Sequence, residues 1–330
     1  MKVQSPTRVD LAGGTLDCWP LYSFVDQNCY TINMAIDIWT EAEVELLEAP
    51  EVKVCIEDLA FQKTYQNLEE FYHSSDKEIS LLKEPVQYWN PSQGLLIRTR
   101  SQSPVGGGLG GSSSLTISLL KAFSHLFNKK MGLLEMVTLA SNMEARLLKT
   151  PTGTQDYIPP IQGGLNVIRY GWDGVSVHTL DVPSNFMNQH MTLVYTGVSH
   201  HSGINNWHVI KSVVEGDSKM FEQLKELSQI SKDLKTCIEK QEWDFQQWAS
   251  LFEREYEVRS QLSPTFICEE IRQLKTLVLQ EGGQAVKICG AGGGGCVMVW
   301  HAPEKKERIK QACQKRGFQV LNAQFVAPLS

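Results

Sequence analysis

The sequence predicts an α+β fold in two domains. The chain has 330 residues, and at roughly 150 residues per domain this length accommodates about two hydrophobic cores. Several segments within the first 100 positions have the pattern of strands, whereas most of residues 197–280 is typical of helices. We therefore expect a strand-rich α+β domain over residues 1–185 and a separate C-terminal domain over residues 186–330.

Alternating apolar residues predict the strands of the first domain. From Tyr30 to Leu46 the apolar side chains fall on every second position. In the second half of this segment glutamates alternate with them, as in a strand with one face exposed to solvent. Further strands are expected over residues 52–57 and 95–100, and a hairpin over residues 165–180 that turns at 172–174.

The period changes after a glycine cluster at residues 106–111. Apolar residues recur at helical spacing from Leu115 to Leu126, and again from Leu133 to Leu147 after a break at Gly132. Two amphipathic helices are therefore predicted.

The second domain is predicted to have a ferredoxin-like, split βαβ arrangement. A strand over residues 191–196 precedes a helix-rich stretch to about residue 280, with breaks at 216–217 and 263–264. The last fifty residues indicate a strand (284–289), a glycine loop, a strand (296–301), a helix (303–316) and a strand (318–327). With the helix after Pro264, the order is β-α-β-β-α-β.

Composition and charge narrow the range of partners. Lysine and arginine number 31 against 37 aspartates and glutamates, so a net charge of −6 gives no overall reason to bind nucleic acid. No stretch approaches the roughly 18 apolar residues of a membrane span, and the N-terminus lacks the apolar core of a secretory signal. The eight cysteines include no C-x-x-C pair, which disfavours a disulfide scaffold or a zinc ribbon. We expect a cytoplasmic monomer or homodimer without a nucleic-acid or membrane partner.

The glycine cluster indicates a phosphate site. Residues 104–114 read PVGGGLGGSSS and lie between a predicted strand and a predicted helix. Successive backbone N–H groups and a helix N-terminus favour an anion there, whereas a flexible turn, the alternative, would need only one or two glycines. The P-loop pattern fails because Ser112 stands where lysine is required. The dinucleotide fingerprint is matched by Gly106, Gly108 and Gly111, but a helix follows where the fingerprint needs a second strand.

A second glycine loop occupies residues 290–295, in the stretch KICGAGGGGC. It joins two predicted strands and opens no helix. One nucleotide site, with the first loop at the phosphates and the second packed closely against it, explains both loops more simply than two separate sites.

Three stretches together resemble the three motifs of the GHMP kinase superfamily. They are PTRVDLAGGTLD at residues 6–17, the loop at 104–114 and the loop at 287–296, in the family's order and across most of the chain. The AGG of the first motif, Thr154-Gln155-Asp156 with the later Gly163-Gly164, and Tyr195-Thr196-Gly197 are most similar to the branch containing D-glycero-D-manno-heptose 7-phosphate kinase and fucose kinase. The resemblance implies the two-domain GHMP kinase fold. It also implies an enzyme that uses ATP and Mg²⁺ to phosphorylate a hydroxyl, expected to be the anomeric one, of a sugar or of a sugar phosphate such as a heptose 7-phosphate.

The resemblance also implies which residues bind the nucleotide and the metal. Ser112 and Glu144 match the family's magnesium ligands. The alternatives are a helix cap for Ser112 and, for Glu144, a structural pair with Arg146 or Arg8. The expected nucleotide-binding residues are Gly106, Gly107, Gly108, Leu109, Gly110, Gly111, Ser112 and Ser113.

For catalysis, Asp156 corresponds to the family's base and Arg8 to the basic residue that pairs with it; an ordinary turn aspartate is the alternative for Asp156. Asp17 corresponds to the sugar-contacting acid, because the interval of nine positions from Arg8 is kept, although Leu16 replaces the usual adjacent threonine. Gly14, Thr15 and Gly292 are the other expected substrate contacts.

The identity of the substrate stays open. His200 and His201 follow Tyr195-Thr196-Gly197 and are candidates for substrate contact, with surface positions as the alternative. An arginine near His200, expected in a heptose phosphate kinase, is missing. A catalytically silent sensor of the same fold and a mevalonate- or homoserine-type kinase are the alternatives, although the presence of Arg8, Ser112, Glu144 and Asp156 argues against silence.

Overall fold

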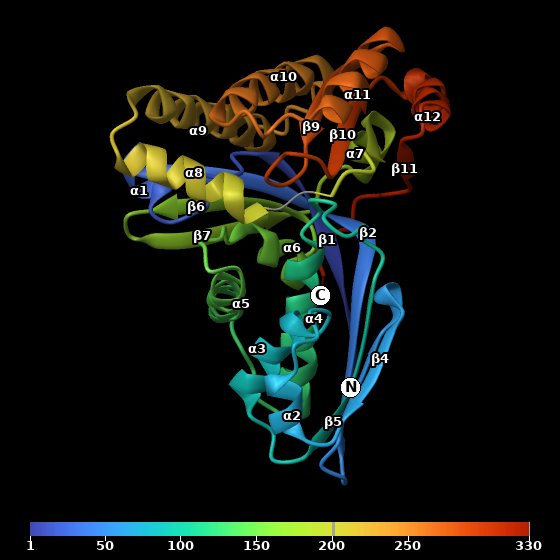
Figure 1. Cartoon of the computed structure of the whole chain (residues 1–330). Coiled ribbons are helices and arrows are strands. Elements are labelled where there is room, and N and C mark those ends of the chain that lie inside the picture. The colour runs from blue at the N-terminus through green and yellow to red at the C-terminus, as the bar shows by residue number, and fades with distance from the viewer. Residues whose placement is uncertain (200–201, 330) are drawn as a thin grey trace.

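The computed structural model describes residues 1–199 and 202–329 and shows two sheets flanked by helices (Figure 1). Within the described chain the strands are β1 (Lys2–Ala12), β2 (Asn28–Leu47), β3 (Val52–Ile56), β4 (Phe61–Tyr65), β5 (Gly94–Ser101), β6 (Leu165–Gly171), β7 (Gly174–Leu180), β8 (Met191–Tyr195), β9 (Gly283–Ile288), β10 (Cys296–His301) and β11 (Gln319–Leu321). The helices are α1 (Leu21–Val25), α2 (Leu68–His73), α3 (Ser80–Trp89), α4 (Gly111–Leu126), α5 (Leu133–Leu148), α6 (Ile158–Gln162), α7 (Ser184–His190), α8 (Ser202–Val214), α9 (Ser218–Glu239), α10 (Phe245–Leu262), α11 (Glu269–Gln280) and α12 (Lys306–Lys315).

The long strand β2 organises the first sheet. β1 pairs antiparallel with one edge of β2, whereas β6 and β5 share the other edge, pairing with its first and last residues. The order of the other strands is β4-β3-β5-β2-β6-β7, and β6–β7 is the predicted hairpin. Register shifts in β1 lie between Pro6 and Thr7, where proline has no N–H to donate, and between Asp10 and Ala12. Such irregularities redirect nearby side chains, and Arg8 and Asp10 lie between the two shifts.

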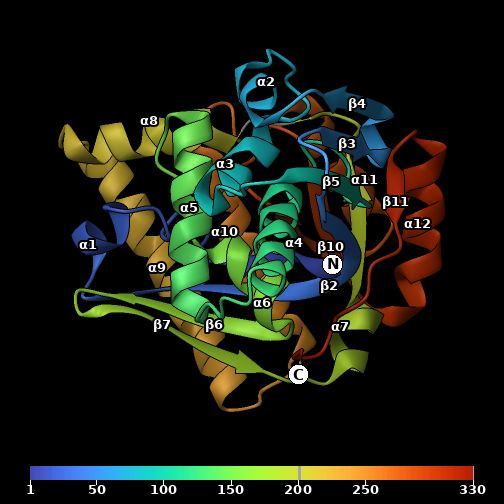
Figure 2. The same ribbon diagram turned by 90° about the horizontal axis from the view of Figure 1, so that it is seen from below.

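Helices α3, α4 and α5 pack side by side on one face of this sheet (Figure 2). Small polar residues allow α4 to approach the strands closely: Ser114 Oγ lies 2.7 Å from Thr40 Oγ1 in β2 and donates to the Pro6 carbonyl at 2.9 Å. The N-terminal turn of α4 is thereby held against β1 at the residues that precede Arg8.

The second sheet confirms the predicted split βαβ arrangement. Its strand order is β11-β8-β10-β9, and each neighbouring pair is antiparallel. Alternate residues of β10 belong to two cores: Met298 and the fully buried Trp300 pack with Trp248 of α10, whereas Val297 and Val299 pack with the buried face of α11. The α+β fold with a separate C-terminal antiparallel sheet is therefore confirmed, whereas the exact division at residue 185 stays a prediction.

The last strand is much shorter than predicted. β11 covers Gln319–Leu321 rather than residues 318–327, and the chain then crosses back to β2. On β2 the pairing with β6 stops at Met34 and the pairing with β5 starts only at Thr40. The tail fills this gap: Val326 N donates to the Ala35 carbonyl at 3.0 Å, and Asp37 N donates to the Gln324 carbonyl at 3.0 Å. Unpaired backbone groups on β2 are thus satisfied by the chain end.

Several elements were not predicted from the sequence, namely β1, β4, α1, α2, α3, α6 and α7. In the described residues no helix is both long enough and apolar enough to span a bilayer.

Candidate active site

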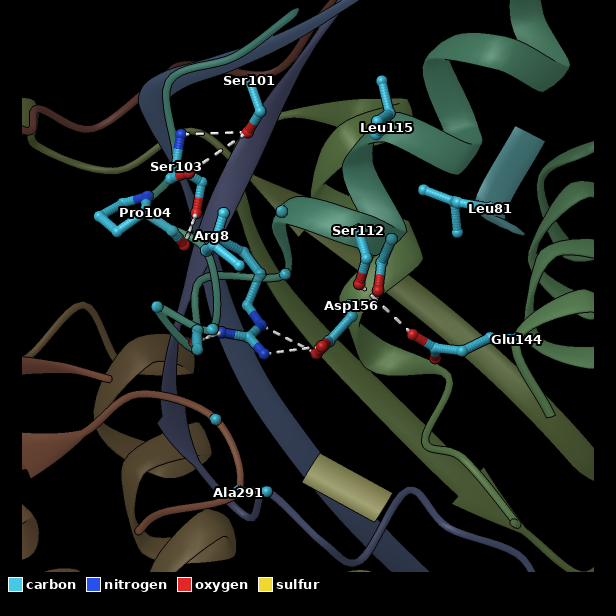
Figure 3. Close-up of a pocket in the computed structure, with 18 of the residues that line it drawn as sticks. Arg8, Leu81, Ser101, Ser103, Pro104, Ser112, Leu115, Glu144, Asp156 and Ala291 are labelled. Atoms are coloured by element: carbon cyan, nitrogen blue, oxygen red, sulfur yellow. Dashed lines mark hydrogen bonds and ion pairs between the residues drawn. The ribbon is translucent and has the colours of Figure 1, made fainter. Parts of the chain in front are cut away.

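A cavity of about 420 Å³ is lined by parts of all three motif segments (Figure 3). Arg8 and Asp17 come from the first, the glycines after Pro104 from the second, and Gly290 and Ala291 from the third. Segments nearly 300 positions apart therefore meet around one cavity.

The first glycine loop forms one wall and has a backbone that favours glycine. Gly106, Gly108 and Gly110 have φ of 64°, 70° and 68°, in the left-handed region that other residues rarely adopt. Gly110 is the N-cap of α4, and no side chain in the described structure caps this helix. Its first amides therefore border the cavity with their partial positive charge available to an anion. The alternative role of Ser112 as the helix cap is wrong.

The second glycine loop, residues 290–295, packs directly against the backbone of the first. Cys296 N donates to the Gly107 carbonyl at 2.7 Å. A Cβ at Gly290 would lie 3.0 Å from Gly108 Cα, and one at Gly295 would lie 2.9 Å from the Gly107 oxygen. The hypothesis that the two loops pack together is confirmed, and their glycines permit that contact between backbones.

Arg8 and Asp156 form a two-bonded ion pair at the cavity. Arg8 Nε and Nη2 donate to the two Asp156 carboxylate oxygens at 2.8 and 2.7 Å, while Nη1 donates to the Gly108 carbonyl. The Arg8 side chain is 4% exposed and that of Asp156 28%, so the carboxylate is the accessible partner. Although burial disfavours the charged guanidinium, the neighbouring Asp156 keeps the pKa of Arg8 above its ordinary value.

Ser112 and Glu144 also meet, as Figure 3 shows. Ser112 Oγ lies 3.5 Å from Glu144 Oε1, while Glu144 Oε2 accepts hydrogen bonds from Tyr157 at 2.6 Å and Thr152 at 2.9 Å. Burial raises the pKa of Glu144, and the hydroxyl donors oppose that rise. The arginine pairs considered for Glu144 are wrong, because Arg146 binds Glu84 at 3.1 Å and Arg8 binds Asp156. Tyr157 and Thr152 were not predicted, since neither is among the residues to which the family resemblance assigns a role.

Asp17 is buried on another side of the same cavity. Its Oδ2 accepts a hydrogen bond from Gln155 N at 3.1 Å, and Gly153 approaches so closely that a Cβ there would lie 2.0 Å from this oxygen. Burial, reinforced by the neighbouring Asp156 and Asp10 carboxylates, raises the pKa of Asp17 to about 6.

The structure does not bring every predicted contact to the cavity. Thr15 and Ser113 line it, but Gly14, Leu109 and Gly292 are not among the described lining residues. A Cβ at Gly14 would lie 2.2 Å from Asp10 Oδ2, and one at Gly292 would lie 2.7 Å from the Phe266 carbonyl. These two glycines therefore serve close internal packing, and Gly290 and Ala291 take the place of Gly292 at the cavity. His200 and His201 lie outside the described residues.

The sequence did not predict several residues that line the cavity. One group is mainly apolar and comprises Ile56, Leu81, Leu82 and Leu115, with Glu78 beside them. Two further lining residues, Asp10 and Arg259, are charged and lie at what we call the base of the cavity. Strand and helix periodicity contains no sign that β3, α3 and α4 converge on one cavity. Asp10, two positions after Arg8 inside the first motif, was the one available signal.

Comparisons with known proteins identify the family and the fold. The GHMP kinases N terminal domain matches residues 76–164 and the GHMP kinases C terminal domain matches residues 241–319, which together make up half of the chain. The D-glycero-alpha-D-manno-heptose 7-phosphate kinase of Campylobacter jejuni is 24% identical over 98% of this chain and 96% of its own length. A mevalonate kinase of Thermococcus sibiricus is 22% identical over 87% of this chain and 86% of its own.

Among solved structures, a D-glycero-D-manno-heptose 1-phosphate kinase from Bacteroides thetaiotaomicron has a TM-score of 0.78 and 21% identity, over 99% of this chain and 96% of that one. The Methanococcus jannaschii mevalonate kinase has a TM-score of 0.77 and 20% identity, over 99% and 98% of the two chains. These similarities concern the fold.

Proposed function

This chain belongs to the GHMP kinase family, and we propose that it transfers the γ-phosphoryl group of ATP to a hydroxyl, the anomeric one, of a small sugar or sugar phosphate. The observation that carries the proposal is the Arg8–Asp156 pair beside the glycine loop, with Ser112 and Glu144 on the same cavity. Similarity to a heptose phosphate kinase over nearly the whole chain supports a sugar as acceptor. The mevalonate-type alternative has weaker support in sequence, and the complete set of polar groups argues against a silent sensor.

The nucleotide would lie along the first glycine loop. Its phosphates would accept hydrogen bonds from the loop amides and from the first turn of α4. The apolar side chains of Ile56, Leu82 and Leu115 offer a surface for the base beyond that turn.

Ser112 at the start of α4 and Glu144 of α5 suit a magnesium ion. Ser112 Oγ and Glu144 Oε1 are hard oxygen donors of the kind that Mg²⁺ prefers, and Tyr157 and Thr152 hold the Glu144 carboxylate in place. Among the described residues there is no group of three or more histidine, cysteine, aspartate or glutamate side chains that could hold a metal ion. Mg²⁺ usually has few protein ligands, and substrate phosphates and water complete its coordination. When bound, it neutralises phosphate charge.

Asp156 would act on the acceptor hydroxyl. Each of its oxygens accepts one Arg8 hydrogen bond and retains a lone-pair direction for a second donor. The carboxylate can therefore orient the hydroxyl and accept its proton as the oxygen attacks the γ-phosphorus. Arg8 holds the carboxylate in one orientation and places a buried positive charge beside the transferred group. Asp17 would accept hydrogen bonds from other hydroxyls of the acceptor.

ADP release across a panel of free sugars, sugar phosphates, mevalonate and homoserine tests the proposal. We expect turnover with a sugar or sugar phosphate, and we expect its 1-deoxy analogue to compete without reacting. Turnover with mevalonate or homoserine alone would contradict a sugar acceptor, and phosphorylation of the 1-deoxy analogue would exclude the anomeric hydroxyl. ATP binding without turnover on any acceptor would favour the silent sensor. The cytoplasmic location and the monomeric or homodimeric state remain predictions.

A further inference from the structure

Four charged side chains form a buried cluster at the base of the cavity. Each is at most 2% exposed. The cluster comprises Asp10 of β1, Glu255 and Arg259 of α10, and Lys287 of β9. Arg259 Nη1 and Lys287 Nζ each lie 3.1 Å from Asp10 Oδ2, and Lys287 Nζ lies 3.0 Å from Glu255 Oε1. The cluster joins the first strand of the chain to elements of the second sheet.

Stability alone is a weak explanation for this cluster. Removing four charges from water is costly, and apolar residues of similar volume often stabilise a core equally well. Two positive and two negative charges balance, yet Asp10 Oδ1, Glu255 Oε2 and Arg259 Nε have no hydrogen-bond partner in the described structure. Buried polar atoms without partners are rare, so their persistence calls for a role beyond packing.

The cluster directly supports the loop that carries Asp17. Arg259 Nη2 donates to Thr15 Oγ1 at 3.1 Å. The backbone of Gly14 lies against the Asp10–Arg259 pair, since a Cβ there would be 2.2 Å from Asp10 Oδ2 and 3.2 Å from Arg259 Nη1. Thr15 has φ of 83°, a conformation unfavourable for a β-branched residue that persists only when its surroundings hold it.

The constraint on Thr15 reaches Asp17 through a short turn. Leu16 N donates to the Gly13 carbonyl and Cys18 N to the Thr15 carbonyl, each at 3.1 Å, so few backbone rotations are free between Thr15 and Asp17. The Asp17 carboxylate itself is held by Gln155 N, which donates a hydrogen bond to its Oδ2 at 3.1 Å. Release of Thr15 would therefore change where Asp17 points.

We propose that Arg259 is a positioning residue for the phosphoryl acceptor: by holding Thr15, it orients Asp17 for binding the sugar. The inference rests on the proposed function, in which Asp17 contacts the sugar. It assigns to α10, which lies outside the three motif segments, a part in building the acceptor site. Arg259 also lines the cavity, but its side chain is only 2% exposed, and its proposed effect on Asp17 passes through Thr15.

Two substitutions break the same contact from opposite sides. R259K keeps the charge of the cluster and can keep an ion pair with Asp10, but it lacks the second guanidinium nitrogen, Nη2, that donates to Thr15. T15V keeps the shape of Thr15 and removes the accepting hydroxyl, and T15S, which retains the hydroxyl, is the matched control. We expect R259K and T15V each to raise KM for the acceptor about ten-fold with KM for ATP unchanged, and T15S to raise it less than T15V because the hydroxyl is retained. The double variant should be no worse than the poorer single variant, because both remove one contact.

The wild-type enzyme is first assayed on the acceptor panel, so the two proposals fail separately. If the acceptor is an alcohol other than a sugar, the proposed function fails, and the KM of that acceptor still tests Arg259. If T15V and R259K lower Tm but leave the acceptor KM at the wild-type value, Arg259 is only structural and the inference is overturned. Effects that multiply in the double variant would also overturn it, and an enzyme with no acceptor would overturn both proposals.

Discussion

The Arg8 guanidinium binds both carboxylate oxygens of Asp156, at 2.8 and 2.7 Å, although the two residues lie 148 positions apart in the chain. Arg8 is anchored further by the Gly108 carbonyl and by its own backbone N–H, which donates to the Leu109 carbonyl at 3.0 Å. The glycine loop and the proposed base are therefore aligned through one buried side chain. A shift of the loop would move both the phosphate site and the carboxylate.

D156N should lower kcat by about 10²–10⁴ with little change in either KM, because asparagine keeps the size of the side chain but cannot accept the hydroxyl proton. Steady-state kinetics provide the measurement. D173N is a matched control, since Asp173 also binds an arginine through two hydrogen bonds, at 2.8 and 3.1 Å, in the β6–β7 turn. Near wild-type turnover of D156N would mean that the reaction does not use this residue as its base.

S112A and E144Q should each raise the Mg²⁺ concentration needed for half-maximal activity, because each removes or weakens one of the two oxygen donors that α4 and α5 bring together. Titration of activity with Mg²⁺ at fixed ATP measures the effect. S124A, further along α4, serves as the control. If E144Q lowers Tm and leaves the Mg²⁺ curve unchanged, Glu144 holds Tyr157 and Thr152 and binds no metal.

G290A should weaken ATP binding by about ten-fold, since its Cβ would press on the backbone of Gly108 at 3.0 Å and displace the phosphate loop. Calorimetric titration measures the affinity. G317A is the control: Gly290 and Gly317 have similar φ, 79° and 86°, but within 4 Å of a Cβ at Gly317 the described structure has no atom. Equal ATP affinities for the two variants would separate the second glycine loop from the nucleotide site.

The raised pKa of Asp17, about 6, predicts a pH dependence for acceptor binding. The ionised carboxylate accepts hydrogen bonds from two hydroxyls more readily than the neutral acid, so KM for the acceptor should fall as pH rises through about 6. D17N should raise this KM and remove its pH dependence, while KM for ATP stays unchanged. A D17N enzyme with the wild-type profile would assign the titration to another group.

Protonation of Asp17 should also affect the stability of the fold, with a pH dependence opposite to that of acceptor binding. Its folded-state pKa lies above the ordinary value of 3.8, so between pH 6 and 3.8 the folded protein binds a proton that the unfolded chain does not. The contribution of Asp17 to the free energy of unfolding therefore increases as pH falls through this window and is lost as pH rises through about 6. Unfolding curves of wild type and D17N at several pH values measure it, and a constant difference between the two would contradict the expectation.

The sequence by itself determined the features that depend on neighbouring residues. Alternating apolar positions in β2, helical spacing in α4 and α5, and the glycines of the two loops each impose a local backbone preference, and each predicted its element. Resemblance to the family also led to Arg8, Asp17 and Asp156, which the structure brings to one cavity.

Tertiary structure alone decided which distant groups meet. The tail around Val326 left the second sheet because β2 had unpaired backbone groups, a gap that exists only once β5 and β6 have paired. Gly14 and Gly292 serve internal packing, and Arg259 reaches Thr15 across 244 positions. Such contacts depend on how helices and sheets pack, and local periodicity contains no information about that packing.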